Sequence, residues 1–477
     1  MKPAFIILSV SIVLICITSC KKWLDVPPAD KFTESQVFSS AAGVSQAMNG
    51  VYLDLSKSKL YGSNLTMTIL EAFAQRYNLA NSSHVFYQYG QYAFREEPVQ
   101  GSLDKIWTSA YVNIVNLNKL ISNLSIYKGV VPPGDDSLYR GEAIALRAML
   151  HFDLLRMFGP MYNNADSTKP AIPYYRQVTT SISPLPTAMQ VMDSILADLN
   201  SAENLLANDP IITQGVNTNL QSDGNDFKRL RNYRMNYYAV KALQARVNLY
   251  RGDKTAALAA AVEVIEKTEF KFPWIDPVKI ISDKANPDRV FSTEVLFGLQ
   301  SLDLYDNYRD YFSADLRDNE ILAPHDGRLK TLFENNEGDY RYIYKWLLAG
   351  NKSYRTFFKY SPPTSDTARH RYMMPLMRKS EMYYIAAEAE ADKNKAVDYL
   401  NKVRFNRGLT DLAYTVNVTT ELQKEYQKEF FGEGQLFFYY KRRGITSVPN
   451  GNSTSGNVSM NATKYVFPLP LSEMQYR

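Results

Sequence analysis

The side chains that most often carry out catalysis are scattered in this sequence. The histidines at positions 84, 151, 325 and 370 lie far apart, and none belongs to a metal-binding spacing such as His-Glu-x-x-His. No serine lies in the pattern of a nucleophile elbow. These spacings favour ordinary packing or surface histidines, and we predict no catalytic residue, no metal site and no cofactor.

Acidic side chains offer a second route to chemistry, because glycoside hydrolases use two carboxylates about 5 to 10 Å apart. The chain has 49 acidic residues, so its sequence leaves open a suitable pair. Glu142, Glu388 and Glu433 lie in helical segments beside arginines, which favours structural ion pairs for these three.

One short stretch places oxygen ligands around a glycine, as calcium loops do. It is Asp223-Gly224-Asn225-Asp226. The other positions of a calcium loop are missing, so the stretch matches weakly. A solvated turn is the favoured interpretation.

Charge and cysteine content exclude further classes. The 54 basic and 49 acidic residues give a net charge of +5. This balance does not favour nucleic-acid binding, which needs basic residues concentrated on one face. The two cysteines, Cys16 and Cys20, both lie near the N-terminus. The rest of the chain has no thiol for catalysis, metal ligation or a disulfide.

Tyrosine is the unusual residue of this chain, with 34 copies within an aromatic content of 13%. Proteins hold a sugar by stacking an aromatic ring on its apolar face and by hydrogen-bonding its hydroxyl edges from Asn, Asp, Arg or backbone groups. Two tyrosine-rich loops, residues 76–92 and 304–311, supply both kinds of group. The predicted ligand-binding residues are Arg76, Tyr77, Asn78, Tyr89 and Tyr92 in the first loop, Tyr305, Asn307, Tyr308 and Tyr311 in the second, and Trp274 in a neighbouring segment.

The three-residue spacing of Tyr305, Tyr308 and Tyr311 would place their rings on one face of a short helical turn. The alternative is that the rings only fasten both loops onto the body of the protein, and the sequence supports the two interpretations about equally. A shallow site of two or three rings is expected to bind weakly, with dissociation constants roughly in the micromolar to millimolar range.

Amphipathic helices are expected to position these loops. Residues 103–124 and 138–158 carry single apolar stripes on either side of a Pro-Pro-Gly turn, which is typical of an antiparallel helix pair. A capping box at Thr187 and the Gly252-Asp253 junction indicate further helices. The predicted fold is mainly α with little β, a scaffold of helix pairs like those of tetratricopeptide repeats. The expected pairs span about 103–158, 187–267 and 377–440, and the last helix is expected to run from Thr419 to about Tyr440.

Long loop-rich inserts separate the helix pairs. Loops of this length in a compact chain are usually functional or disordered, and their aromatic content argues against disorder. We therefore expect a single domain over 20–477 in which the helices form the scaffold and the inserts carry the ligand face. The inserts lie at about 56–102, 208–232, 268–375 and 441–470.

The first 19 residues are typical of a lipoprotein signal peptide. Lys2 precedes an apolar run over residues 4–17, which is too short to span a membrane. Thr18 and Ser19 are the small residues expected before a lipidated cysteine, so Cys20 is predicted to become the acylated first residue and to attach the chain to a membrane. An ordinary secretory leader is the alternative.

A series of different short motifs is distributed along the chain from one end to the other. They are Cys20-Lys21-Lys22 with Leu24-Asp25 and Pro28; Trp107, Tyr111 and Asn116; Gly141-Glu142-Ala143, Leu146-Arg147-Ala148, Phe152 and Phe158-Gly159; Asp326-Gly327-Arg328; Glu381, Ala387-Glu388-Ala389, Asn401, Val403-Arg404 and Arg407-Gly408; Glu425, Glu429-Phe430, Glu433-Gly434 and Lys441-Arg442; and Pro468-Leu469-Pro470 with Glu473. This ordered set resembles the SusD/RagB family of outer-membrane nutrient-binding lipoproteins.

The resemblance implies a fold, a ligand and a partner. The fold would be a helical scaffold with tetratricopeptide-like pairs and an irregular, loop-built ligand face. The ligand would be a glycan, or less often a peptide, captured at the cell surface. The partner would be a SusC-like TonB-dependent outer-membrane barrel, over which the lipoprotein sits as a lid. The chain departs from the family at Tyr426 and Gln435, where arginine is usual, at Tyr439, where aspartate is common, and at Lys21-Lys22, which lacks an acidic run.

We therefore predict a lipoprotein on the outer face of the outer membrane that binds an oligo- or polysaccharide, performs no chemistry and delivers its ligand to the barrel. Three alternatives remain: a peptide-binding member of the same family, a lipid-anchored glycoside hydrolase with two essential carboxylates, and a helix-pair scaffold that binds only proteins. The scaffold alternative expects the loop tyrosines to be packed and inaccessible.

Overall fold

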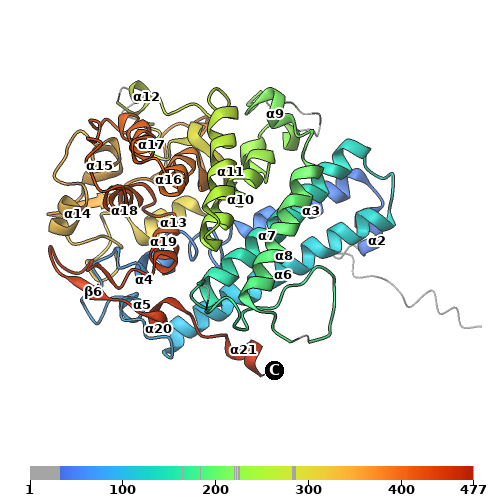
Figure 1. Ribbon diagram of the computed structural model, residues 1–477, viewed down its shortest axis with the longest axis horizontal. Helices are drawn as coiled ribbons and strands as arrows, with labels where there is room; N and C mark the ends of the chain where they lie inside the picture. The colour runs from blue at the N-terminus through green and yellow to red at the C-terminus, as the bar shows by residue number, and fades with distance from the viewer. Residues whose placement is uncertain are drawn as a thin grey trace, which may run out of the picture.

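The structure, a computed structural model, describes residues 33–475 except 164, 183, 220, 222, 224, 225 and 282–285. The predicted signal peptide and Cys20 lie outside these residues. Helices dominate the described chain and the strands are few and short, which confirms the mainly α prediction (Figure 1). Among the helices described, none is both long enough and apolar enough to cross a bilayer.

Long helices pack side by side to form the scaffold. Along this series each helix contacts the next, from α6 through α7, α8, α10, α11 and α16 to α17, as tetratricopeptide-like pairs do. In Figure 1 the pairs run from the cyan and green helices on one side to the orange helices on the other. The bounds are α6 (Glu97–Ile126), α7 (Pro133–Phe158), α8 (Ala188–Leu205), α10 (Tyr237–Arg251), α11 (Lys254–Lys267), α16 (Lys379–Ala389) and α17 (Lys393–Phe405).

Local signals in the sequence fix several helix ends. The Thr187 side chain accepts a hydrogen bond from Gln190 N while the Gln190 side chain accepts one from Thr187 N, as a capping box requires. Asp253 caps α11, and Gly252 adopts the left-handed conformation that ends α10. The prediction for α7 was five residues too short, because Pro133 occupies the first turn, where a missing N–H costs nothing.

The last long helix was predicted as one element from Thr419 to about Tyr440, and this prediction is wrong. The structure has two helices, α18 (Val418–Glu429) and α19 (Gln435–Arg443). Gly432 and Gly434 between them have φ of +73° and +70°, which only glycine adopts at little cost. A Cβ at Gly434 would lie 2.0 Å from the Leu65 carbonyl oxygen. The break therefore lets the residue 56–102 insert approach the backbone at this point.

The inserts contain more regular structure than predicted. Three two-stranded antiparallel sheets, β1–β4, β2–β3 and β5–β6, lie within or beside them. The insert at 56–102 is shorter than expected because α6 begins at Glu97. The remaining elements are α2 (Glu34–Phe38), α3 (Ala41–Leu55), α4 (Ile69–Phe73), α5 (Tyr87–Gly90), α9 (Pro210–Gln214), η2 (Asp226–Lys228), η3 (Arg231–Tyr233), α12 (Pro277–Ile281), η4 (Ser292–Glu294), β1 (Val295–Gln300), α13 (Leu304–Tyr311), α14 (Asp326–Leu332), α15 (Tyr340–Lys345), β2 (Trp346–Leu348), β3 (Arg355–Phe357), β4 (Met373–Arg378), β5 (Ser447–Pro449), β6 (Asn457–Ser459), α20 (Ala462–Tyr465) and α21 (Leu471–Met474).

A buried group of charged residues joins the longest insert to the last helices. Glu429 accepts from Arg407 at 2.7 Å and lies 3.1 Å from both Arg378 and Arg341. Arg407 also bonds Glu294 at 2.6 Å, and the side chains of all five residues are fully buried. Buried charges are tolerated only when they are paired in this way. We call Glu294, Arg341, Arg378, Arg407, Glu425 and Glu429 the central ion cluster.

The structural ion pairs predicted for three glutamates are confirmed. Glu142 on α7 bonds Arg231 at 2.5 Å and Arg234 at 2.9 Å, which fastens the 208–232 insert to the scaffold. Glu388 bonds Arg442 at 2.6 Å. Glu433 pairs with Arg378 at 2.9 Å and also with Lys359.

Candidate ligand-binding face

The two tyrosine-rich loops, which are more than 200 positions apart in sequence, lie against each other in the structure. Asn78 N donates to Ala323 O at 2.8 Å, and His84 Nε2 lies 3.2 Å from Ile321 O. The Phe86 ring meets Tyr311 edge-on, with 6.0 Å between centroids. The first loop therefore borders α13 and the segment that follows it, and together they form one face.

The row Tyr305, Tyr308 and Tyr311 lies on helix α13, as its spacing predicted. All three side chains are half-buried, with one side packed against the core. The supporting rings are Tyr372 at 4.7 Å from Tyr305, Phe358 at 5.9 Å from Tyr308, and Phe86 beside Tyr311. Each tyrosine is thus held by an aromatic neighbour and keeps part of its surface accessible, which the scaffold alternative did not expect.

Polar groups surround this row. Asp306, Arg309 and Asp310 on α13 are exposed, with Arg309 paired to Asp306 at 2.8 Å and to Asp310 at 3.0 Å. Desolvation by burial raises the pKa of Tyr308 to about 12, so its hydroxyl stays protonated and can donate. Asn78 is also exposed. We call the three tyrosines, Phe86, Phe358, Asn78, Asp306, Arg309 and Asp310 the tyrosine face.

Sequence reasoning missed the rings that support the tyrosines. Phe86 lay within the first loop but was not singled out, and Phe358 and Tyr372 belong to the insert without any spacing that marks them. Tyr372 has a φ of +61°, a conformation that tyrosine rarely adopts. Its backbone N–H donates to the Tyr305 hydroxyl at 3.1 Å. This hydrogen bond and the ring contact connect Tyr372 to the row, and no sequence spacing marks either of them.

Two tyrosines and one asparagine that were predicted to bind the ligand are buried instead. Tyr77 is 1% exposed and donates to Met67 O at 2.5 Å. Tyr89 is buried and bonds Pro98 O at 2.7 Å. Asn307 is buried and donates to Gly62 O at 2.9 Å. These contacts hold the two loops to the body, so these three side chains are not part of the tyrosine face.

Tyr92 and Trp274 also face neighbouring protein atoms. Tyr92 is buried and donates to Phe73 O at 2.8 Å, and desolvation raises its pKa. Trp274 is half-buried and packs 5.3 Å from Tyr383. Arg407 and Lys379 also lie over its ring. Both residues lie apart from the α13 row, and we leave them out of the tyrosine face.

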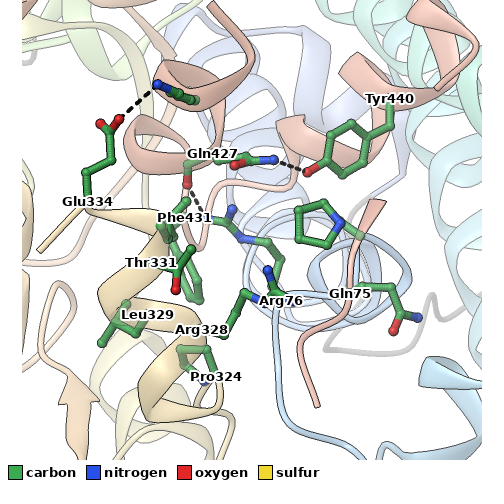
Figure 2. Close-up of a pocket in the computed structure, with 14 residues that line it drawn as sticks. Gln75, Arg76, Pro324, Arg328, Leu329, Thr331, Glu334, Gln427, Phe431 and Tyr440 are labelled. Carbon is green, nitrogen blue, oxygen red and sulfur yellow. Dashed lines mark hydrogen bonds and ion pairs between the residues drawn. The ribbon is translucent and has the colours of Figure 1, made fainter. Parts of the chain in front are cut away.

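Arg76 lines a separate small cavity of about 220 Å³ (Figure 2). Its Nη2 donates to Gln427 O at 2.5 Å, its Nε lies 3.2 Å from Glu71, and its guanidinium lies 4.1 Å from the Phe431 ring centre. Gln427 in turn donates to the Tyr440 hydroxyl at 2.8 Å. Because its charge is already paired and buried, Arg76 fastens the first loop to α18 and is not counted in the tyrosine face.

Three of the four histidine side chains have structural contacts. Burial lowers the pKa of His151 to about 3, and its ring stacks on Tyr174 at 4.0 Å. His84 accepts from Phe86 N at 3.0 Å, and His325 caps α14. Asp223 and Asp226 of the weak calcium match both pair with Arg229. Within the described parts of the chain, no group of three or more His, Cys, Asp or Glu side chains could hold a metal ion.

Comparisons with known proteins agree with this architecture. Residues 22–218 match a family model described as starch-binding and associating with the outer membrane, and residues 319–474 match the SusD family model. A SusD-like protein P38 from Formosa agariphila is 29% identical over 151 residues, which are 31% of this chain and 24% of that relative. The match to this curated relative therefore spans about a quarter of its length.

Solved structures share the fold across nearly the whole chain. A SusD superfamily protein from Bacteroides thetaiotaomicron is 21% identical with a TM-score of 0.72, over 91% of this chain and 98% of that one. A putative sugar-binding protein from Bacteroides vulgatus is 21% identical with a TM-score of 0.69, over 91% and 96%. A laminarin-binding SusD-like protein is 17% identical with a TM-score of 0.63, over 91% and 97%. The chain belongs to the SusD/RagB family.

Proposed function

We propose that this protein is a non-catalytic glycan-binding lipoprotein of the outer membrane. It captures an oligo- or polysaccharide on the tyrosine face and delivers it to a SusC-like TonB-dependent barrel. The lipid on Cys20 keeps it at the outer surface, beside that partner. The family membership supports this proposal, as do the sugar-binding and laminarin-binding descriptions of proteins with the same fold.

The observation that carries the proposal is the meeting of two loops that sequence patterns selected independently. Their contact produces a row of half-exposed rings with exposed amide, carboxylate and guanidinium groups around it. Such a surface offers a stacking plane for the C–H face of a sugar and partners for its hydroxyl edges. Because the row is shallow, we expect weak binding, roughly micromolar to millimolar, which suits a protein that must release its ligand.

Affinity electrophoresis through gels containing a panel of neutral polysaccharides tests the binding. At least one polysaccharide should retard the mature protein, and the double substitution Tyr308→Ala with Tyr311→Ala should remove that retardation. Tyr414→Ala is the matched control, because Tyr414 is 52% exposed and lies beyond α17, outside the tyrosine face. Retardation of the double variant equal to that of the unaltered protein would contradict this site.

Incubation with labelled oligosaccharides tests the hydrolase alternative, and product formation would contradict the non-catalytic proposal.

Substitution of Cys20 tests the anchor independently. Cys20→Ala should release the protein from the membrane fraction while leaving its retardation by polysaccharide unchanged, because the thiol lies outside the binding face. Growth on the bound polysaccharide should then collapse. Growth equal to that of the unaltered strain would contradict delivery from the membrane surface.

A further inference from the structure

A cleft larger than the Arg76 cavity lies beside Tyr372, whose ring packs against Tyr305 of the tyrosine row. It has a volume of about 720 Å³, within the range of small-molecule sites. Tyr372 and Tyr233 are among its lining residues, and Phe270 at its edge is 92% exposed. The cleft is thus a space of ligand size with aromatic rings available to a sugar.

The lining of this cleft is basic. Lys271, Arg369 and Arg371 contribute cations, and Asp366 is the one carboxylate among its described lining residues. Asp366 pairs with Arg371. Lys271 Nζ donates to Lys267 O at 3.0 Å and lies 5.9 Å from the Tyr238 ring, but has no carboxylate partner in the described chain. The Arg369 guanidinium has no ion-pair partner there either. Two cations therefore remain available to a ligand.

Two buried polar atoms of the cleft's lining residues lack hydrogen-bond partners in the described chain. Asn232 lines the cleft and is 6% exposed, and its Oδ1 has no hydrogen-bond partner among the described residues. The same holds for the buried Nε of Arg371. Buried polar atoms are normally paired, so these two remain available to the hydrogen-bonding groups of a ligand. The left-handed backbone of Tyr372 is a further cost that is stored at functional sites more often than elsewhere.

We infer that this cleft binds the oxyanion groups of an acidic oligosaccharide, either uronate carboxylates or sulfate esters, through Lys271 and Arg369. The inference rests on the proposed glycan-binding function and names the class of sugar. Guanidinium and ammonium groups make their strongest hydrogen bonds to such oxyanions. The rings of Tyr233, Tyr372 and Phe270 would face the sugar rings between the charged groups.

Titration calorimetry on the mature protein with four probes tests this inference. The probes are tetragalacturonate, a sulfated galactan tetrasaccharide, neutral galactotetraose and inorganic sulfate. At low salt, at least one acidic tetrasaccharide should bind ten or more times tighter than the neutral one, and this preference should weaken as salt rises. The first two probes distinguish carboxylate from sulfate recognition. Inorganic sulfate binding as tightly as the tetrasaccharides would overturn the inference, because the cleft would then hold only a free ion.

The double substitution Lys271→Gln with Arg369→Gln should lower the affinity for the acidic tetrasaccharide about tenfold or more and leave retardation by neutral polysaccharide unchanged. Lys402→Gln is the matched control, because Lys402 is exposed on α17 and lines neither the cleft nor the tyrosine face. Unchanged acidic binding in the double variant would overturn the inference. The Tyr308→Ala and Tyr311→Ala substitutions test the proposed function separately, through retardation by neutral polysaccharide. Failure of the proposed function is therefore distinguishable from failure of the inference about acidic sugars.

Discussion

The central ion cluster and the tyrosine face both draw on the insert at 268–375, yet they use polar side chains in opposite ways. In the cluster, Glu294, Arg378, Arg407 and Glu429 are fully buried and bonded to each other. On the face, the rings are half-exposed and the charged groups around them reach solvent. Side chains rich in hydrogen-bonding capacity thus hold the insert together where they are buried, and remain accessible to a ligand where they are exposed.

This difference separates stability from binding. A buried charge that loses its partner leaves the other charge unpaired in a medium that solvates it poorly. A half-exposed ring that is removed loses only one face of packing. We therefore expect substitutions in the cluster to destabilise the protein. Substitutions on the face should leave its stability nearly unchanged and weaken ligand binding. The predictions below test that separation.

The largest effect is expected for Glu429→Ala. Glu429 contacts three arginines, so its loss leaves Arg341, Arg378 and Arg407 each with one carboxylate partner fewer. The free energy of unfolding should fall by about 3 to 5 kcal/mol, measured by urea denaturation. The control Glu34→Ala breaks an exposed pair with Lys119 and should cost no more than about 0.5 kcal/mol. Equal losses in the two variants would contradict the distinction between buried and exposed pairs.

Acid should destabilise the protein through the same cluster. Arg341, Lys428 and Arg404 outweigh desolvation and lower the pKa of Glu425 to about 2. Because this folded pKa is below the unfolded value of about 4.3, the stabilisation is present above pH 4.3 and is lost as the pH falls toward 2. The loss attributable to Glu425 is roughly 3 kcal/mol. Urea midpoints measured from pH 6 to pH 3 should decline, and a flat profile would contradict the lowered pKa.

On the tyrosine face, the Tyr308→Ala and Tyr311→Ala substitutions should weaken polysaccharide binding. Together they should weaken the affinity for a retarding polysaccharide at least tenfold, about 1.4 kcal/mol or more, because both stacking planes are removed. The urea midpoint should move far less than in Glu429→Ala, since each ring is only partly buried. If the midpoint falls as far as in Glu429→Ala, the rings act mainly as packing, and the face would not be separable from the core.

The sequence was informative about the scaffold for a physical reason. Helix pairs, caps and stops are local, so the stripe at 103–124, the Thr187 capping box and the Gly252 stop could be read from neighbouring residues. The predicted pairing of Glu142, Glu388 and Glu433 also held. The split between α18 and α19 was missed because it depends on Gly434 meeting Leu65 O, some 370 positions away. The departures at Tyr426 and Tyr439 became a stacked ring pair, with 4.3 Å between centroids.

For the face, the sequence selected two loops that the structure places in contact, but it could not rank their residues. Tyr77 and Tyr308 both lie in tyrosine-rich stretches, yet one is buried and the other half-exposed. Which ring turns inward depends on long-range partners, such as Phe431 and Phe312 beside Tyr77. No spacing within the loop records these contacts. Composition therefore predicted where aromatic and polar side chains gather, and tertiary packing decided which of them are exposed.

The smallest effect, and the sharpest test of this distinction, is expected for Tyr77→Phe. The substitution keeps the ring and its contacts with Phe312 and Phe431, but removes the hydroxyl that donates to Met67 O. A carbonyl left without this donor should cost about 1 kcal/mol of unfolding free energy. Retardation by polysaccharide should be unchanged, because a residue only 1% exposed cannot reach a ligand. Weaker retardation at full stability would mean that the first loop opens to bind, and would place Tyr77 among the ligand contacts after all.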